Sequence, residues 1–223
     1  MSRTLQKRAA ASSKATPTRR PLLIGVGITV GFVAILAAIF AANSGGPPAS
    51  EGSGSGYRFD VGSPGPGEQA PPLRLPAADG NTFDLADLSG QTVLLYFQEG
   101  LMCPPCWDQL RDIEAEGDRF TALGIDSIVT ITTDNVDLLA RRVADEGLRS
   151  PVLSDLGREV SEAWGTLGAG MMGGATNGHS FVVVGHDGNI RWRADYGGAP
   201  DFTMYLPVSA LLADLRQGLD AAG

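Results

Sequence analysis

Cys103 and Cys106 are the only cysteines in this chain of 223 residues, so no other pair can close a disulfide within it. They closely follow residues 92–97, an apolar run whose length and composition are typical of a strand covered on both faces. From Trp107 onward apolar residues recur at helical spacing, with a break near Gly117. The sequence therefore predicts a buried strand that runs into a cysteine pair at the start of a helix.

Strand and helix continue to alternate after this unit. Further strands are predicted where β-branched or apolar runs occur, at residues 125–133, 151–153, 180–184 and 189–194. Further helices are predicted over residues 134–147, 154–164 and 207–219. Asn135 and Gly147 are suitable first and last caps for the first of these helices. His186-Asp187-Gly188 is a strong hairpin signal. This order predicts an α/β domain with a central mixed sheet flanked by helices.

The N-terminal residues predict where the domain works. Residues 1–20 hold six basic and no acidic side chains, and residues 21–42 are uncharged and mainly apolar. About 20 apolar residues suffice to cross a bilayer as a helix. The positive flank predicts a cytoplasmic tail, one transmembrane helix over residues 21–42 and an extracytoplasmic domain in the cell membrane. The alternative is a cleaved export signal, for which Ala42 or Ser44 would mark the cleavage site and Arg19-Arg20 would resemble a twin-arginine motif.

Residues 43–66 are rich in Gly, Ser and Pro, which predicts a flexible linker, and residues 67–223 remain for one domain of ordinary size. Beyond the basic tail the chain carries 11 basic and 25 acidic residues, a net charge of −14. Such a charge would be repelled by nucleic acid, so we expect no nucleic-acid binding.

A strand that enters Cys-x-x-Cys at a helix start resembles the thioredoxin fold. The order of further segments is similar to the peroxiredoxin-like (alkyl hydroperoxide reductase/thiol-specific antioxidant) branch, and to membrane-anchored thiol–disulfide oxidoreductases of cytochrome c maturation. Four segments carry this resemblance: residues 70–73, 79–90, 154–165 and 179–190. Together they imply a thioredoxin-like fold over about residues 67–220 and a redox-active disulfide between Cys103 and Cys106.

The position of the pair at a helix N-terminus gives the two thiols different roles. Unpaired backbone N–H groups and the helix dipole favour a thiolate there, and only the thiolate attacks a disulfide. We expect Cys103 to be the exposed attacking thiolate and Cys106 to be the resolving thiol that displaces the bound partner. Pro104 and Pro105 suit a first helical turn because they lack N–H groups. No cofactor or metal is needed for this exchange.

Three other interpretations of the pair remain open. A structural disulfide would gain little, because the closed loop is short. A zinc site usually needs four ligands, and the chain has two Cys and two His. His179 and His186 lie at opposite ends of one predicted strand, so we do not expect them to converge with the cysteines. A Cu(I)-handling metallochaperone of thioredoxin fold would use the soft sulfur atoms of the cysteines with those of Met102, Met171 and Met172. The histidine of such a site would be His179, which begins the next predicted strand.

The chain departs from the related families at positions that carry their chemistry. Peroxidatic cysteines follow Pro-x-x-x-Thr/Ser-x-x-Cys, and here Tyr96 and Gly100 stand at the Pro and Thr positions. An antioxidant peroxidase is therefore a weaker alternative. Arg191 or Arg193 could replace the family's arginine, although each is more simply a surface residue of a strand.

The loop before the hairpin departs from the pattern as well. Thioredoxins place a cis-proline opposite the cysteines, and Gly178 or His179 occupies that place here, on a loop that we expect to face the substrate.

The buried thiol also needs a proton acceptor. Cytochrome-c-maturation proteins carry a Glu three residues after the second cysteine, where this chain has Gln109. Glu99 and Asp108 are the nearest carboxylates, and the alternative is that both are solvated surface residues. We expect the partners to be thiols and disulfides of exported proteins, with a membrane thiol-electron carrier as the source of electrons.

Overall fold

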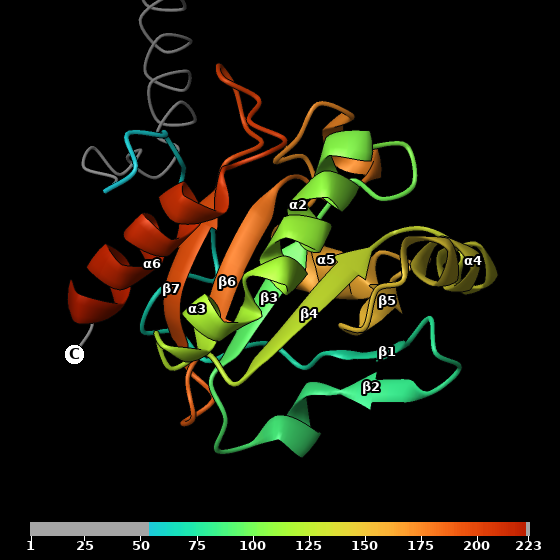
Figure 1. The fold of residues 1–223 in the computed structure, drawn as a ribbon, viewed down its shortest axis with the longest axis horizontal. Helices are drawn as coiled ribbons and strands as arrows, with labels where there is room; N and C mark the ends of the chain where they lie inside the picture. The colour runs from blue at the N-terminus through green and yellow to red at the C-terminus, as the bar shows by residue number, and fades with distance from the viewer. Residues whose placement is uncertain (1–53, 222–223) are drawn as a thin grey trace, which may run out of the picture. The chain divides into compact units, whose positions relative to one another are not determined.

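The computed structural model describes residues 54–221, which form a thioredoxin-like α/β fold around a five-stranded sheet of order β5-β4-β3-β6-β7 (Figure 1). The sheet strands are β3 (Val93–Phe97), β4 (Ser127–Thr132), β5 (Val152–Ser154), β6 (Ser180–Val184) and β7 (Ile190–Asp195). The pairs β3–β4 and β4–β5 are parallel, whereas β3–β6 and β6–β7 are antiparallel. The predicted mixed sheet is therefore confirmed, with β3 at its centre.

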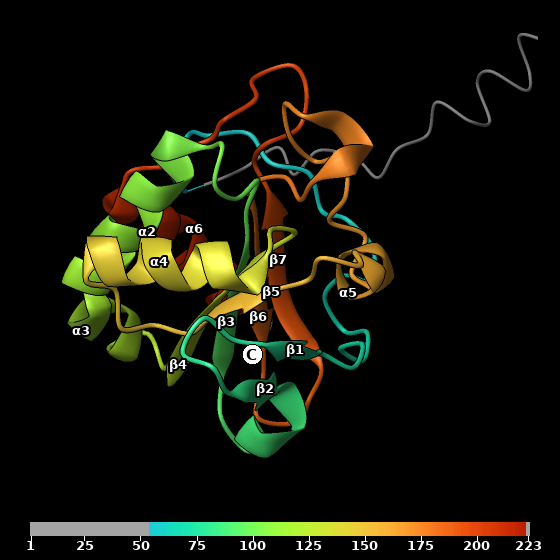
Figure 2. The same ribbon diagram turned by 90° about the vertical axis from the view of Figure 1, so that its right-hand side faces the viewer.

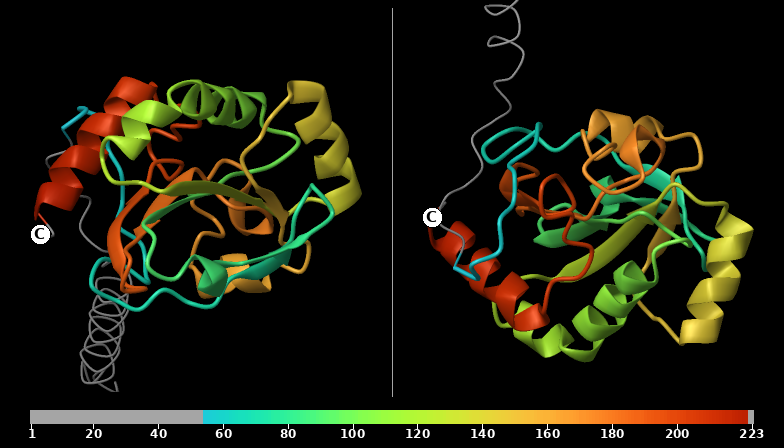
Figure 3. Two further views of the ribbon diagram at one scale, coloured as in Figure 1. Left: turned by 60° about the horizontal axis from the view of Figure 1, so that its bottom comes forward. Right: turned by 90° about the horizontal axis from the view of Figure 1, so that it is seen from above.

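Two layers cover the sheet, as Figure 3 shows most clearly. One face packs against α2 (Pro104–Ala115), α3 (Gly117–Thr121), α4 (Val136–Glu146) and α6 (Val208–Ala221). The other face packs against α5 (Glu159–Ala163), the small hairpin of β1 (Arg74–Pro76) and β2 (Thr82–Asp84), and the short helix η1 (Leu85–Leu88). A further short helix, η2 (Gly173–Ala175), lies in the loop before β6.

The alternation of side chains along β3 explains why this strand is buried throughout. Leu94 and Tyr96 join the core beneath the helices, whereas Val93, Leu95 and Phe97 join the core on the opposite face. A strand buried on both faces reads as a continuous apolar run, which is why its length and composition located it in the sequence.

Most helix ends follow the local chemistry of the sequence. Asn135 caps α4 by accepting from the N–H of Asp137, and Gly147 ends that helix in the left-handed conformation. The helix predicted from residue 154 begins later, at Glu159. The reason is Asp155, whose carboxylate accepts from the backbone N–H and the hydroxyl of Ser161 and so holds the preceding turn outside the helix.

The predicted linker over residues 43–66 needs correction at its C-terminal end. Phe59 is buried against the rings of Trp192 and Tyr196, and the backbone of Asp60 pairs with that of Asp195. Residues 57–66 therefore belong to the folded domain, because Phe59 and Val61 pack on the core and Asp60 pairs with β7.

The predicted cytoplasmic tail over residues 1–20, the transmembrane helix over 21–42 and residues 43–53 of the linker lie outside the described residues. Within residues 54–221, none of the helices combines the length and the apolar character that a membrane crossing requires. The anchor therefore stays a prediction.

Candidate redox site at the start of helix α2

The central strand β3 delivers the cysteine pair to one end of the sheet. Cys103 is the N-cap residue of α2, and Pro104 and Pro105 fill the first helical positions as predicted. Cys103 and Cys106 form a disulfide, with their Cα atoms 5.3 Å apart. The Cys103 N–H donates to the carbonyl of Gly100 at 3.0 Å, which fixes the tight turn between strand and helix.

The disulfide is covered more completely than the sequence predicts. Cys103 is 4% exposed and Cys106 is fully buried, so Cys103 is the more accessible thiol but is not an exposed one. Met204, from the loop between β7 and α6, forms a small buried cluster with the two cysteines. No sequence signal pointed to Met204, because it is a single apolar residue in a loop far from the cysteines along the chain.

Glu99 is a buried carboxylate, and its interpretation as a solvated surface residue was wrong. Its side chain accepts from the backbone N–H of Met171 at 2.5 Å and of Met172 at 3.1 Å. Glu99 thereby holds the loop over residues 168–176 next to the segment that leads to Cys103. Burial, assisted by the charge of Glu99, raises the pKa of Tyr96, whose hydroxyl donates to the Cys106 carbonyl at 3.4 Å.

Asp108 has the surroundings of a solvated surface residue, which was the alternative interpretation of this carboxylate. It lies on the exposed side of α2, about half accessible, and pairs with Arg111 one turn further along. Arg111 also binds Glu146 of α4 at 2.5 Å. Asp108 is therefore bound in a surface network, whereas Glu99 is the carboxylate of the two that is buried.

Gly178 and His179 lie beneath the surface at the start of β6, so the expectation that these two residues face a substrate directly needs correction. A side chain on Gly178 would overlap the carbonyl of Ala169, so only glycine fits there. The N–H of His179 donates to the same carbonyl at 3.1 Å. The loop over residues 168–172 therefore lies between this segment and solvent.

The His179 ring is fully buried among aromatic side chains. It meets Tyr96 and Phe181 edge-on, with ring centroids 5.3 and 5.1 Å away. Neither ring nitrogen has a hydrogen-bond partner at good geometry, although the backbone of Thr203 lies close enough to act on the ring. Burial lowers the pKa of His179 to about 3, and the Thr203 backbone offsets this only in part. The ring is therefore neutral at physiological pH.

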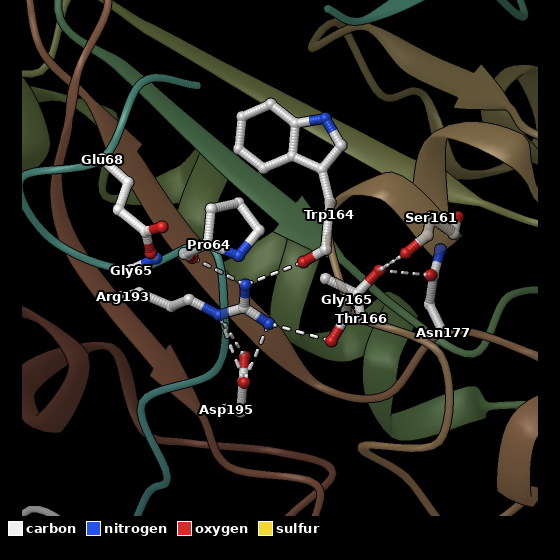
Figure 4. A network of polar contacts seen from close by, with 10 residues as sticks. All are labelled: Pro64, Gly65, Glu68, Ser161, Trp164, Gly165, Thr166, Asn177, Arg193 and Asp195. Atoms are coloured by element: carbon white, nitrogen blue, oxygen red, sulfur yellow. Dashed lines mark hydrogen bonds and ion pairs between the residues drawn. The ribbon is translucent and has the colours of Figure 1, made fainter. Parts of the chain in front are cut away.

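Arg193 is also buried, which corrects its interpretation as a surface residue of a strand. Figure 4 shows its guanidinium bonded to the Asp195 carboxylate and to three backbone carbonyls, those of Pro64, Trp164 and Gly165. These contacts occupy the guanidinium donors, so Arg193 has none left to orient a peroxide. Arg191 lies against Gly185, where β6 ends, whereas the cysteines follow the opposite end of the sheet.

Gly100 has a conformation that excludes the threonine of peroxidatic sites. Its φ is +93°, and a Cβ atom there would overlap the Asp134 carboxylate. That carboxylate accepts from the N–H of Leu101 at 2.8 Å, and the Trp107 indole donates to the Gly100 carbonyl at 3.0 Å. The turn before the cysteines is therefore built around glycine.

The methionines of the copper interpretation differ from the histidine in their accessibility. Met102, Met171 and Met172 are exposed, whereas His179 is enclosed by aromatic rings. Among residues 54–221, no three His, Cys, Asp or Glu side chains are grouped so that they could hold a metal ion.

Comparisons with known proteins agree with this geometry. The sequence profile of the AhpC/TSA family matches residues 66–193. A provisionally named peroxiredoxin of Mycobacterium tuberculosis is 41% identical over 128 residues, 56% of this chain and 81% of that protein. The thiol–disulfide oxidoreductase ResA of Halalkalibacterium halodurans is 31% identical over 100 residues, 44% of this chain and 56% of that protein.

Solved structures show the same fold. The peroxidoxin BcpB of Mycobacterium tuberculosis superposes with a TM-score of 0.57 at 23% identity, covering 68% of this chain and 96% of that structure. A thiol:disulfide interchange protein of the DsbE type from Chlorobium tepidum, itself named provisionally, superposes with a TM-score of 0.52 at 19% identity, covering 74% and 98%. A protein named as a peroxidoxin and one named as a thiol:disulfide interchange protein thus share this fold.

Proposed function

The chain belongs to the AhpC/TSA family of oxidoreductases, and on this premise we propose that it exchanges disulfides with exported proteins through Cys103 and Cys106. The observation that carries the proposal is a disulfide at the first turn of α2, with the N-terminal cysteine the more accessible. The similarity to ResA supports the same reaction class.

The geometry supports a two-step exchange. In the reduced protein the N-terminus of α2 favours the Cys103 thiolate, which attacks a partner disulfide and forms a mixed disulfide while one partner sulfur leaves. Cys106, one turn further, then attacks the Cys103 sulfur and releases the second partner sulfur. Two electrons pass from the cysteine pair to the partner, and Glu99 is the candidate group to accept the Cys106 proton.

The location is part of the proposal. Residues 21–42 would anchor the protein in the cell membrane with residues 1–20 in the cytoplasm, so that the redox domain works outside. A membrane thiol-electron carrier would then have to supply electrons from the cytoplasm. Protease treatment of intact cells should cleave the domain and spare the tail if this orientation is right.

Single cysteine variants test the exchange. Cys106→Ser should trap a mixed disulfide with an oxidised substrate, because nothing displaces the partner, whereas Cys103→Ser should neither trap nor reduce it. Reduction of insulin disulfides by Cys103→Ser would overturn the mechanism. A reduction potential of about −270 mV would identify a reductant, and a potential of about −120 mV would identify an oxidant.

A peroxidase is the second candidate, because several relatives carry peroxiredoxin names. There a Cys103 thiolate would attack a peroxide oxygen, giving a sulfenic acid and water or an alcohol. The Cys106 thiol would then attack the sulfenic sulfur, which breaks its S–O bond, closes the disulfide and releases water. Gly100 and the fully engaged Arg193 argue against it. If the protein consumes peroxide with a thiol donor at least as fast as it reduces insulin, the peroxidase becomes the favoured candidate instead.

Copper handling is the third candidate and rests on the exposed Met171 and Met172. The reduced chain should then bind one Cu(I) and lose it on Met171→Ala with Met172→Ala. If no copper is taken up, this candidate is removed.

A further inference from the structure

Exposed large apolar side chains gather at the end of the sheet that carries the disulfide. Among residues 54–221 eight such side chains are exposed, and five of them lie on the loops around the cysteines. These five, here called the disulfide rim, are Met102, Met171, Met172, Phe202 and Tyr205. Figure 2 shows the loops that carry them together at one end of the fold. Exposed apolar groups concentrated in this way mark an interaction surface.

The disulfide rim lies on three loops: the loop before α2, the loop before β6 and the loop between β7 and α6. Contacts between these loops make the rim one surface. Glu99 fixes the backbone of Met171 and Met172 next to the segment of Met102. A side chain on Gly197 would overlap the carbonyl of Ala169, so the loop before β6 touches the loop between β7 and α6. On the loop between β7 and α6, Met204, which shares a buried cluster with the two cysteines, stands between Phe202 and Tyr205 in the sequence.

The surroundings of the rim are acidic. The segments that build this end of the fold are residues 98–112, 132–137, 166–179 and 196–206. They contain six carboxylates and one guanidinium, a net charge of −5: Glu99, Asp108, Asp112, Asp134, Asp137, Asp201 and Arg111. Within these segments the cation, Arg111, is itself bound to Asp108 and to Glu146. Just outside them Arg58 and Asp60, of opposite charge, line a pocket together with Asp201. A positively charged partner is attracted to this surface, and an anionic one is repelled.

We propose that the disulfide rim docks polypeptides whose cysteines are flanked by lysine or arginine and by an apolar side chain. This inference rests on the proposed function and narrows its substrate class. Methionine side chains adapt to varied apolar groups, so the rim sets no strict sequence, while the carboxylates select the charge of the partner. The reaction itself is balanced: the reduced cysteine pair and a peptide disulfide give the Cys103–Cys106 disulfide and two peptide thiols.

Matched peptides test the charge selection. Three peptides with the same internal disulfide and one leucine, flanked by lysine, serine or glutamate residues, are reduced by the full-length reduced protein. At low ionic strength the second-order rate constant should be at least about tenfold higher for the lysine peptide than for the glutamate peptide. The difference should shrink in about 0.5 M salt, where charges are screened over a few ångströms.

Three double variants assign the effects to this surface. Asp137→Asn with Asp201→Asn should reduce the lysine preference at least about threefold. Asp87→Asn with Asp220→Asn makes the same change in net charge away from the rim segments and should leave it intact. Met171→Gln with Met172→Gln should slow reduction of all three peptides and leave the melting temperature unchanged.

The outcomes separate the inference from the proposed function. Equal rates for the lysine and glutamate peptides would overturn the charge selection while leaving disulfide exchange intact. An unchanged rate in the methionine variant would overturn docking at the rim. If the protein reduces none of the three peptides, the proposed function itself fails.

Discussion

Gly100 and Asp134 approach each other so closely that no side chain fits between them. Gly100 has a φ of +93°, and Asp134 binds the next backbone N–H, that of Leu101, at 2.8 Å. The contact joins the loop after β3 to the loop after β4, directly before the cysteines. The position at which peroxidatic sites carry threonine is thus used here to brace the turn, and the threonine cannot be restored by one substitution.

Substitution of Gly100 should destabilise the protein through this contact. Gly100→Ala combines backbone strain with overlap of the Asp134 carboxylate, whereas Gly80→Ala has a similar φ of +87° and open space around the new Cβ. We expect Gly80→Ala to cost about 1 kcal/mol and Gly100→Ala about 2 kcal/mol more. Urea unfolding of both variants measures the difference, and equal losses would show that strain alone matters.

The buried Glu99 should control the order of the loop over residues 168–176. Glu99→Ala leaves two N–H groups without their acceptor, at a cost of about 1–3 kcal/mol each. Glu99→Gln keeps a carbonyl oxygen that can accept from both. Hydrogen exchange at Met171 and Met172 should therefore accelerate in the alanine variant and change little in the glutamine variant.

Asp108→Ala is the control for a nearby carboxylate and should leave these amides protected, since its side chain faces solvent. Proton transfer by Glu99 has a separate readout. If Glu99 accepts the Cys106 proton, Glu99→Gln should change the pH profile of disulfide exchange while the loop stays ordered. An unaltered profile would assign Glu99 to loop positioning alone.

Arg193 should contribute far more to the free energy of unfolding than an exposed arginine that is also paired with an aspartate. Arg193→Met would leave Asp195 and three carbonyls without their donor, and losing one member of a buried pair costs about 3–5 kcal/mol. Arg74→Gln removes an exposed pair with Asp84 and should cost less than about 1 kcal/mol. Thermal unfolding compares the two variants, and similar losses of stability would contradict a stabilising role of the buried Arg193 contacts.

Local patterns located what depends on local chemistry. The buried run of β3, the break at Gly117, the cap at Asn135 and the hairpin at residues 186–188 were all confirmed, because each depends on residues close in sequence. The position of the cysteines at the start of α2 follows from the same reasoning.

Contacts between distant segments were beyond the reach of the sequence. Glu99 and Arg193 read as surface residues because, apart from Asp195 beside Arg193, their partners are backbone groups of loops some 30 to 130 positions away, which leave no mark on local composition. Met204 and the packed strip around Phe59 were missed for the same reason. Burial of a charged group depends on the tertiary partners that satisfy it, and a single sequence does not reveal them.

His179 should make the protein sensitive to mild acid. Its pKa is lowered from 6.5 to about 3 by burial, so the folded protein holds it neutral while the unfolded chain protonates it below about pH 6.5. The unfolded state therefore binds more protons between these values, and stability is full above pH 6.5 and falls as the pH approaches 3. From pH 7 to pH 5 the loss from this group is about 2 kcal/mol. His179→Phe keeps an aromatic ring between Tyr96 and Phe181 and should remove that loss, whereas His186→Gln, at an exposed turn, is the matched control. Urea unfolding at both pH values gives the comparison, and an equally steep loss in His179→Phe would show that other groups carry the acid sensitivity.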